Sequence, residues 1–117
     1  MIFVIDDDEI MAECIARACG NGVKTRIFSN VIAAMNTIAV GKIPKLIFLD
    51  VMLTGPDGFT FLNEMISYPD TAKIPIVIVT SLRLAQKDFS TYGVVGVLEK
   101  DTMLPQEIKA YVEQYAE

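Results

Sequence analysis

Histidine is absent from the 117-residue sequence, and so is tryptophan. Without an imidazole, the chain offers no histidine general base, no serine–histidine–aspartate triad, no histidine-ligated metal and no phosphohistidine of its own. Cysteine is scarce: Cys14 and Cys19 are five residues apart in a helix-like segment, about 140° apart around its axis, so they are poorly placed to pair. Two thiols fall short of a zinc site, and free thiols suit a reducing cytosol, so we expect a cytoplasmic protein.

Basic residues are also too few to bind a polyanion. Ten Lys and Arg stand against 15 Asp and Glu, which gives a net charge of -5. Because sequence-independent binding to nucleic acid needs a surplus of cations, we expect no direct contact with nucleic acid. No apolar run reaches the ~18 residues that span a bilayer. Residues 1–5 are apolar but lead straight into three aspartates, unlike a signal peptide, so we expect no membrane insertion.

Short apolar runs alternate with segments of helical periodicity along the whole chain. The predicted strands are residues 2–5, 23–28, 45–50, 76–79 and 94–98. The predicted helices are residues 9–19, a segment capped by Ser29 and ended by Gly41, residues 59–66, residues 82–92 and a last segment that begins at Pro105. The side chains expected to face the core from the first two helices are Ile10, Met11, Cys14, Ile15, Ala18, Ile32, Met35, Ile38 and Ala39.

Five strand–helix units predict an α/β fold. Strands that are apolar on both faces and alternate with helices indicate a parallel sheet covered on both sides. We expect a flavodoxin-like (βα)5, doubly wound, five-stranded parallel sheet with strand order 2-1-3-4-5, and a single domain over residues 1–117. In that order, ligands bind at the carboxyl ends of the strands, between the first and third strands.

Polar residues follow four of the predicted strands, at the point where each strand ends. Asp6 and Asp7 follow the first strand, Asp50 the third, Thr80 the fourth and Lys100 the fifth. Two like charges ~4 Å apart repel by ~4 kcal/mol at an effective dielectric constant of 20, so one lysine does not offset three carboxylates. Either a carboxylate takes up a proton or a cation fills the site. Carboxylate oxygens without histidine or cysteine suit Mg²⁺, and a hydroxyl and an ammonium beside it suit phosphoryl transfer.

Four segments in this order resemble a response-regulator receiver domain of two-component signalling, of the chemotaxis-regulator type, over essentially the whole chain. They are Val4-Ile5-Asp6-Asp7, Leu49-Asp50-Val51-Met52-Leu53-Thr54-Gly55-Pro56-Asp57-Gly58, Ile78-Val79-Thr80-Ser81 and residues 93–100. The resemblance implies that a sensor histidine kinase or a phosphotransfer protein phosphorylates Asp50. It further implies that transfer to Asp50 is self-catalysed, with no turnover on an external substrate.

The resemblance also assigns the other site residues. Asp7 and Asp50 would hold Mg²⁺ directly together with the backbone carbonyl of Met52, and Asp6 would act largely through water. Thr80 would sense the phosphoryl group and Lys100 would pair with it. No effector domain follows in this chain, so we expect a separate effector protein to read the helix over residues 82–92, the fifth strand and the last helix.

Three residues depart from the usual receiver pattern. Asp101 stands where a proline usually follows the lysine in a cis peptide; a non-proline cis bond costs ~3–4 kcal/mol, so we expect Lys100–Asp101 to be trans. Val97 stands where an aromatic switch residue is usual, a role that Tyr92 is placed to take over. Thr54 stands where a proline often stiffens the loop after the phosphoacceptor. These departures leave the chemistry intact and put the output mechanism in question.

Other interpretations of the function stay open at this point. A pseudo-receiver, a binding module that keeps the fold but not the switch, fits the missing aromatic and proline. A phosphohydrolase of the haloacid-dehalogenase type would need a second aspartate where Met52 stands, so it is disfavoured.

Asp8 is assigned only to capping the first helix. Met52 and Leu82 are apolar at positions that flank the site, which predicts slow self-dephosphorylation.

Overall fold

The computed structural model describes residues 1–52, 58–81, 89 and 91–116. Five parallel strands form one sheet in the order β2-β1-β3-β4-β5, as predicted. The elements in chain order are β1 (Ile2–Ile5), α1 (Glu9–Cys19), β2 (Thr25–Phe28), α2 (Val31–Ala39), β3 (Leu46–Leu49), α3 (Gly58–Ile66), α4 (Pro69–Ala72), β4 (Ile76–Thr80), β5 (Val94–Glu99) and α5 (Pro105–Tyr115).

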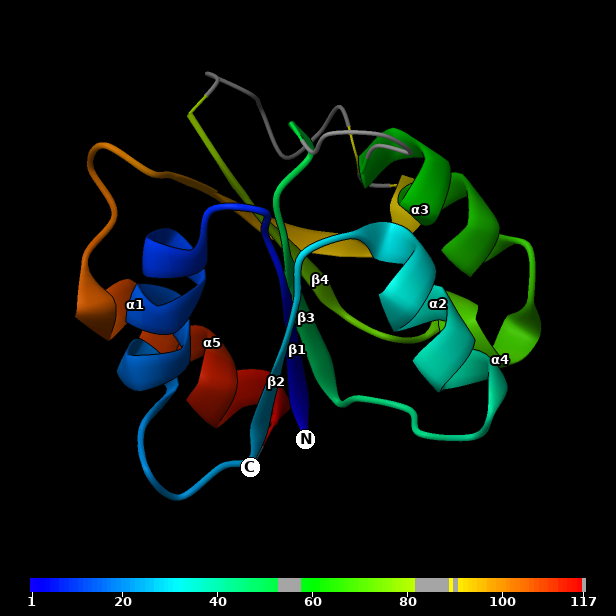
Figure 1. Ribbon diagram of the computed structural model, residues 1–117, viewed down its shortest axis with the longest axis horizontal. Helices are drawn as coiled ribbons and strands as arrows, with labels where there is room; N and C mark the ends of the chain where they lie inside the picture. The colour runs from blue at the N-terminus through cyan, green and yellow to red at the C-terminus, as the bar shows by residue number, and fades with distance from the viewer. Residues whose placement is uncertain (53–57, 82–88, 90, 117) are drawn as a thin grey trace.

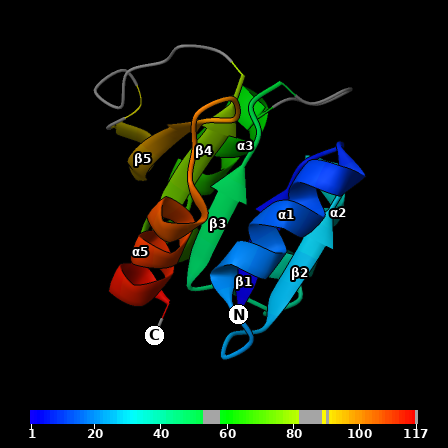
Figure 2. The same cartoon turned by 90° about the vertical axis from the view of Figure 1, so that its left-hand side faces the viewer.

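Helices cover both faces of the sheet (Figure 1): α1 and α5 lie on one face, and α2, α3 and α4 on the other. Figure 2 shows α1 and α5 side by side in front of the strands. Alternate residues of each central strand enter separate cores, as the two-residue period of a strand requires. Phe3, Ile47 and Ile78 belong to the core under α2 and α3, whereas Val4 and Phe48 belong to the core under α1 and α5.

Because the strands are parallel, the two edges of the sheet at which they begin and end differ in kind. All strands run the same way, so their carboxyl ends meet at one edge, where the predicted site residues stand. β1 begins and α5 ends at the opposite edge (Figure 1). No helix among the described ranges is long and apolar enough to cross a membrane.

The inward face predicted for α1 is right in part, since Ile15 is buried and Met11 and Ala18 pack, partly buried, against the core under α1 and α5. The predicted inward residues Ile10 and Cys14 are exposed, and the buried residues are Ala12, Ile15 and Cys19. These three lie within about 60° of one another around the axis at 100° per residue, and Ile10 lies about 160° from Ala12. The apolar residues of α1 form one broad arc with Ile10 at its edge, so only packing decides which part of the arc is buried. Burial raises the pKa of the Cys19 thiol to about 11, which makes it an unreactive core residue.

The second helix and the segment after the third also differ from the prediction. Asn30, not Ser29, caps α2: its side-chain oxygen accepts a hydrogen bond from the Ala33 N–H at 2.9 Å. Ile32 of α2, one of the predicted inward residues, is exposed. Pro69 starts the short helix α4, which the sequence did not predict, and the fixed φ of proline suits a first helical turn. Most of the helix predicted over residues 82–92 lies outside the described residues.

The absence of a side chain at Gly58 lets α3 pack closely against the end of β3. A Cβ on Gly58 would lie 2.6 Å from the Val51 Cα and 3.1 Å from the Asp50 carbonyl oxygen. These neighbours are backbone atoms, which cannot turn aside as a flexible side chain can. The helix therefore approaches the Asp50 segment only because residue 58 has no side chain.

We expect Gly58→Ala to lower the free energy of unfolding by about 1–3 kcal/mol, because the added methyl group overpacks this contact. Urea denaturation would measure the change. Gly22→Ala is the matched control, since no atom lies within 4 Å of a Cβ at that position, and it should change stability by less than about 1 kcal/mol. Equal effects of the two substitutions would contradict the close approach.

Candidate functional site

Two buried carboxylates meet at the carboxyl ends of adjacent strands. Ile5 of β1 is in register with Leu49 of β3, so Asp6 and Asp50 follow them side by side. The Asp50 N–H donates to the Ile5 carbonyl oxygen at 2.9 Å, which continues the ladder to this point. Asp6 is 2% exposed and Asp50 is 4% exposed. Both residues are thus held in a protein environment that disfavours two negative charges.

Each carboxylate is oriented by the backbone two residues further on. Asp6 Oδ1 accepts a hydrogen bond from the Asp8 N–H at 2.9 Å, and Asp50 Oδ1 accepts one from the Met52 N–H at 2.8 Å. Such turns are typical of aspartate, whose short side chain reaches the backbone at this spacing. The second oxygen of each carboxylate is left to face the other groups of the site.

Lys100 joins the two carboxylates. Its Nζ lies 2.9 Å from Asp6 Oδ2 and 2.9 Å from Asp50 Oδ2, where it donates a hydrogen bond. The lysine follows β5, and its backbone N–H donates to the Thr80 carbonyl oxygen at 2.8 Å. Thr80, at the end of β4, is fully buried. The ends of β1, β3, β4 and β5 therefore converge on one small polar site.

The ionisation of this site is perturbed. Burial raises the pKa of Asp6 above its usual value of 3.8, although the Asp8 backbone N–H and the Lys100 ammonium act in the opposite direction. For Lys100, burial alone would lower the pKa. The ion pairs with Asp50 and Asp6 outweigh burial and raise the pKa of Lys100 above 10.5. The pKa of Asp6 is thus raised even with Lys100 beside it.

The donor set fits a hard cation. One carboxylate oxygen each from Asp6, Asp7 and Asp50 lies within 4.8 Å of the others. Asp7 is exposed, so the cluster is open to solvent on its side, whereas the other two are buried. Lys100 approaches Asp6 Oδ2 at ion-pair distance, yet this buried oxygen has no hydrogen-bond partner among the described residues. Oxygen-only donors at such spacing are the ligands that Mg²⁺ prefers.

The structure thus brings together the five predicted residues Asp6, Asp7, Asp50, Thr80 and Lys100. Met52 contacts the site through its N–H; the role of its carbonyl as a ligand stays a prediction. Asp8 caps α1 as expected, since its side chain accepts from the Met11 N–H at 3.1 Å.

Sequence analysis missed one function of Asp8, namely that its backbone N–H orients Asp6. The two-residue spacing of an aspartate turn is the signal that would have revealed it.

The structure describes two of the three positions that depart from the usual receiver pattern, Asp101 and Val97. The Lys100–Asp101 peptide bond is trans, as expected. Val97 is in register with Ile78 of β4 and packs, half-buried, against the core under α2 and α3. Tyr92 packs against the same core, so an aromatic ring does lie on the face of the sheet that Val97 occupies. Thr54 and Leu82 lie outside the described residues.

We expect Asp6→Asn to stabilise the fold at pH 7 when no divalent cation is present, by an amount on the order of 1 kcal/mol. Because folding raises the pKa of Asp6, the folded state holds this proton more tightly than the unfolded chain does. The stability linked to Asp6 is therefore fully present below about pH 3.8 and is lost as the pH rises through the raised value. The amide has no such loss, so the variant and the wild type should diverge as the pH rises.

Urea denaturation as a function of pH would measure this divergence. Asp8→Asn is the matched control, because it makes the same chemical change at an exposed residue and keeps a good helix cap. At pH 7, Asp8→Asn should not stabilise the fold. A destabilised Asp6→Asn protein at pH 7 would show instead that the ionised carboxylate is a net stabilising group.

Known proteins are similar to this chain in sequence and in structure. The response regulator PleD of Caulobacter vibrioides is 42% identical over 45 residues, which cover 38% of this chain and 10% of PleD. The chain thus matches only about a tenth of the length of that curated relative.

Solved structures match over nearly the whole chain. A putative response regulator from Chloroflexus aurantiacus is 26% identical with a TM-score of 0.83, and the match covers 97% of this chain and 93% of that one. The Mn²⁺-bound form of response regulator Rcp1 is 21% identical with a TM-score of 0.78, with 96% and 91% covered.

The family model of the response regulator receiver domain matches residues 2–113. This match takes in all five strands and most of α5, together with every residue of the acidic cluster and Lys100. The chain therefore belongs to the response regulator receiver domain family of two-component signalling.

Proposed function

We propose that this chain is a phosphoacceptor switch that takes a phosphoryl group onto Asp50 and changes its binding to a partner. The donor in a phosphorelay of this kind is the phosphohistidine of a sensor histidine kinase or of a phosphotransfer protein. The chain has no histidine, so the donor is a separate protein or a separate part of a longer one. Reduced thiols and the nature of the donor fit a cytoplasmic location.

The observation that carries the proposal is the bridge from Lys100 Nζ to both Asp6 and Asp50, each at 2.9 Å. A phosphoryl group on Asp50 would add negative charge to a place where an ammonium group and a buried hydroxyl residue already lie. Preorganised positive charge is the main means by which proteins accelerate phosphoryl transfer.

In the proposed step, a carboxylate oxygen of Asp50 attacks phosphorus in line with the leaving nitrogen. The phosphorus–nitrogen bond of the phosphohistidine breaks, the phosphorus–oxygen bond to Asp50 forms, and the imidazole leaves with the bonding electrons. The Met52 N–H holds Asp50 Oδ1 in place during this exchange. Lys100 shifts its ion pair from the carboxylate to the new phosphoryl oxygens. The protein is thus its own catalyst for one transfer and no enzyme toward an external substrate.

We assign the cation ligands from the same cluster. Asp7 and Asp50 would hold Mg²⁺ directly, with the Met52 carbonyl as a third ligand and Asp6 largely through water. Mg²⁺ bound there supplies positive charge that offsets the phosphoryl oxygens. The three carboxylates supply the oxygen ligands that such an ion needs.

The response to phosphorylation would start at Thr80 and Lys100, which share a backbone hydrogen bond. A shift at Thr80 moves β4 against β5, where Val97 and the neighbouring Tyr92 pack on the core. A separate effector protein would read the change at residues 82–92, β5 and α5.

One observation favours a second candidate, a pseudo-receiver that binds a partner regardless of phosphorylation. The residue in register with Ile78 is Val97, which has no ring to move between two positions. The complete carboxylate and lysine cluster supports the switch over this alternative.

Acetyl phosphate with Mg²⁺ should add one phosphoryl group to the wild type, as read by intact mass, and none without the cation. Asp50→Ala should abolish the adduct, because it removes the accepting oxygen. Asp70→Ala removes an exposed carboxylate on α4 and is the matched control, which should label like the wild type.

Two negative results together would contradict the switch. They are the absence of an adduct while a known receiver labels in parallel, and unchanged amide resonances of Thr80 and β5 after fluoroberyllate and Mg²⁺ are added. That pair of outcomes is what the pseudo-receiver predicts.

We expect the phosphorylated protein to lose its phosphoryl group slowly, over minutes or longer. The side chain of Met52 is largely exposed beside Asp50 and has no group that orients an attacking water. Met52→Asn should accelerate the loss several-fold in a time course of intact mass. Ile66→Asn, at an exposed apolar residue of α3, should not. A wild-type half-life of seconds would refute this assignment.

A further inference from the structure

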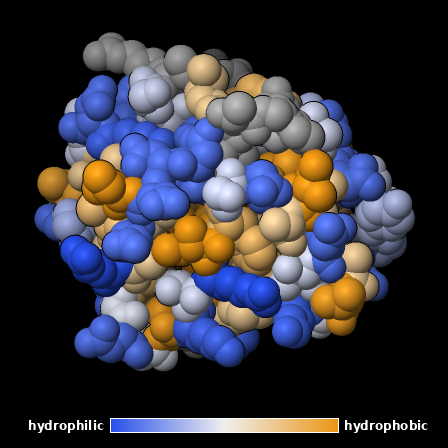
Figure 3. All heavy atoms as spheres, in the orientation of Figure 1, coloured by the Kyte–Doolittle hydropathy of each residue, from blue (hydrophilic) through white to orange (hydrophobic). Residues whose placement is uncertain are grey.

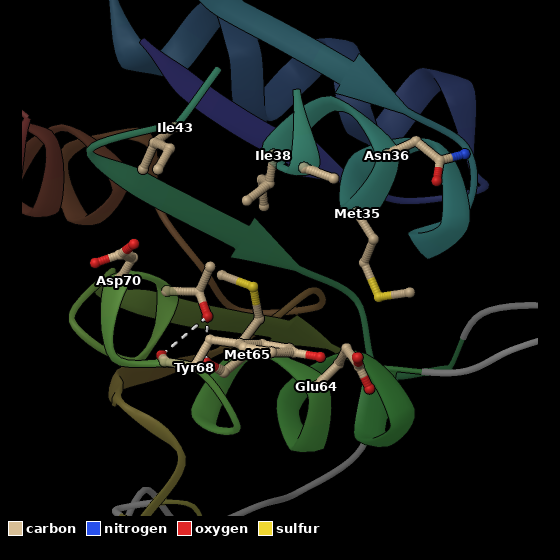
Figure 4. A pocket seen from close by; sticks show the side chains of 10 residues that line it. Met35, Asn36, Ile38, Ile43, Glu64, Met65, Tyr68 and Asp70 are labelled. Carbon is tan, nitrogen blue, oxygen red and sulfur yellow. Dashed lines mark hydrogen bonds between the residues drawn. The ribbon is translucent and has the colours of Figure 1, made fainter. Parts of the chain in front are cut away.

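A pocket of about 450 Å³ lies between α2 and the pair α3 and α4, on the face of the sheet opposite α1 and α5. Its lining residues come from α2 and the segment after it on one side and from α3 and α4 on the other (Figure 4). They are Met35, Asn36, Ile38, Ala39, Ile43, Glu64, Met65, Tyr68, Asp70 and Thr71. None of them belongs to the carboxylate and lysine cluster, so the pocket is a separate feature.

The floor of the pocket is apolar, and large apolar side chains at its border are exposed to solvent. Ile38 and Met65 are buried at its base. Ile43 is 46% exposed and Tyr68 is 57% exposed. In the space-filling view, hydrophobic surface interrupts hydrophilic surface over α2 and α3 (Figure 3). An apolar hollow with exposed apolar borders is typical of a surface that another molecule covers.

The wall formed by α3 and α4 is held in shape by its own hydrogen bonds. The Thr71 hydroxyl donates to the Met65 carbonyl oxygen and lies 3.2 Å from that of Tyr68. These contacts fix the turn between the two helices, with Met65 on one side and Tyr68 on the other. The pocket is thus largely preformed, and the unbranched side chain of Met35 opposite this wall can adapt to an occupant.

Charge limits what the occupant can be. Glu64 and Asp70 lie at opposite ends of the pocket (Figure 4). The ten lining residues that the structure describes include no lysine or arginine. The whole chain carries a net charge of -5, so a second copy would bring further negative charge to this surface. A partner that suits it has apolar groups in the middle and positive charges at both ends.

We propose that this α2–α3 groove binds a basic amphipathic helix of a partner protein, with apolar side chains on the Ile38 and Met65 floor and Lys or Arg beside Glu64 and Asp70. A helix laid between two helices presents apolar residues at positions i, i+3 or i+4, and i+7, which matches an apolar floor between α2 and α3. The groove lies away from Asp50, so the proposal does not depend on phosphorylation of that residue.

The test uses a synthetic helical peptide of about 14 residues, roughly 21 Å long, with leucines along one stripe and lysines flanking it. This length fits across a molecule whose extents are 32 × 30 × 24 Å. A second peptide carries the same leucines with glutamates in place of the lysines. Fluorescence anisotropy measures affinity and amide chemical shifts locate the bound peptide. The basic peptide should bind with shifts in α2, α3 and α4, and the acidic peptide should not bind.

Two sets of variants separate charge from apolar contact. Glu64→Lys with Asp70→Lys should weaken binding of the basic peptide roughly tenfold, since two exposed ion pairs become repulsive. Glu13→Lys with Glu113→Lys makes the same change in net charge at exposed residues of α1 and α5, and it should change affinity less than about twofold. Ile43→Ser should weaken binding several-fold without altering charge.

Several results would overturn the proposal. They are no binding of the basic peptide, equal binding of the two peptides, equal effects of the two charge-reversed proteins, and chemical shifts confined to the Asp50 edge or to β5 and α5. Self-association of the wild type that Glu64→Lys with Asp70→Lys abolishes would assign the groove to a second copy instead. Each of these outcomes is independent of whether acetyl phosphate labels Asp50.

Discussion

The order of the parallel strands, which brings one ammonium group to two buried carboxylates, is the constraint on which the acidic site depends. Asp6 and Asp50 lie at the ends of adjacent strands, and Lys100 Nζ is 2.9 Å from an oxygen of each. Two unpaired carboxylates ~4 Å apart would repel by ~4 kcal/mol at an effective dielectric constant of 20. The lysine can reach them only because β5 lies next to β4 and β4 next to β3. The order of the strands therefore places the ammonium group between the two carboxylates.

The sheet and the site residues could be predicted because both follow from short-range signals. Runs such as Ile2–Ile5 and Leu46–Leu49 are apolar at every position, which is typical of strands buried on both faces. Each ends in a polar residue, and parallel strands bring those ends to the same edge. Asp6, Asp50 and Lys100 are thus assigned to one site by the sequence alone.

The faces of the helices could not be predicted in the same way. The apolar residues of α1 form one broad arc, and packing against the sheet buries the part with Ala12 and Ile15 and leaves the edge with Ile10 exposed. The cap of α2 is equally a matter of geometry, since Ser29 and Asn30 are both good caps in sequence. The groove between α2 and α3 had no sequence signal either, because its residues come from segments that are about 30 positions apart.

The positions of the first strand and the last helix have a practical consequence. β1 starts and α5 finishes at the edge of the sheet opposite Asp50 (Figure 1). A fluorophore, a surface anchor or a fused protein attached near either of these points would be separated from the acidic edge by the full length of the strands. Immobilised or fused forms of the chain would thus leave that edge open to large molecules arriving from solution.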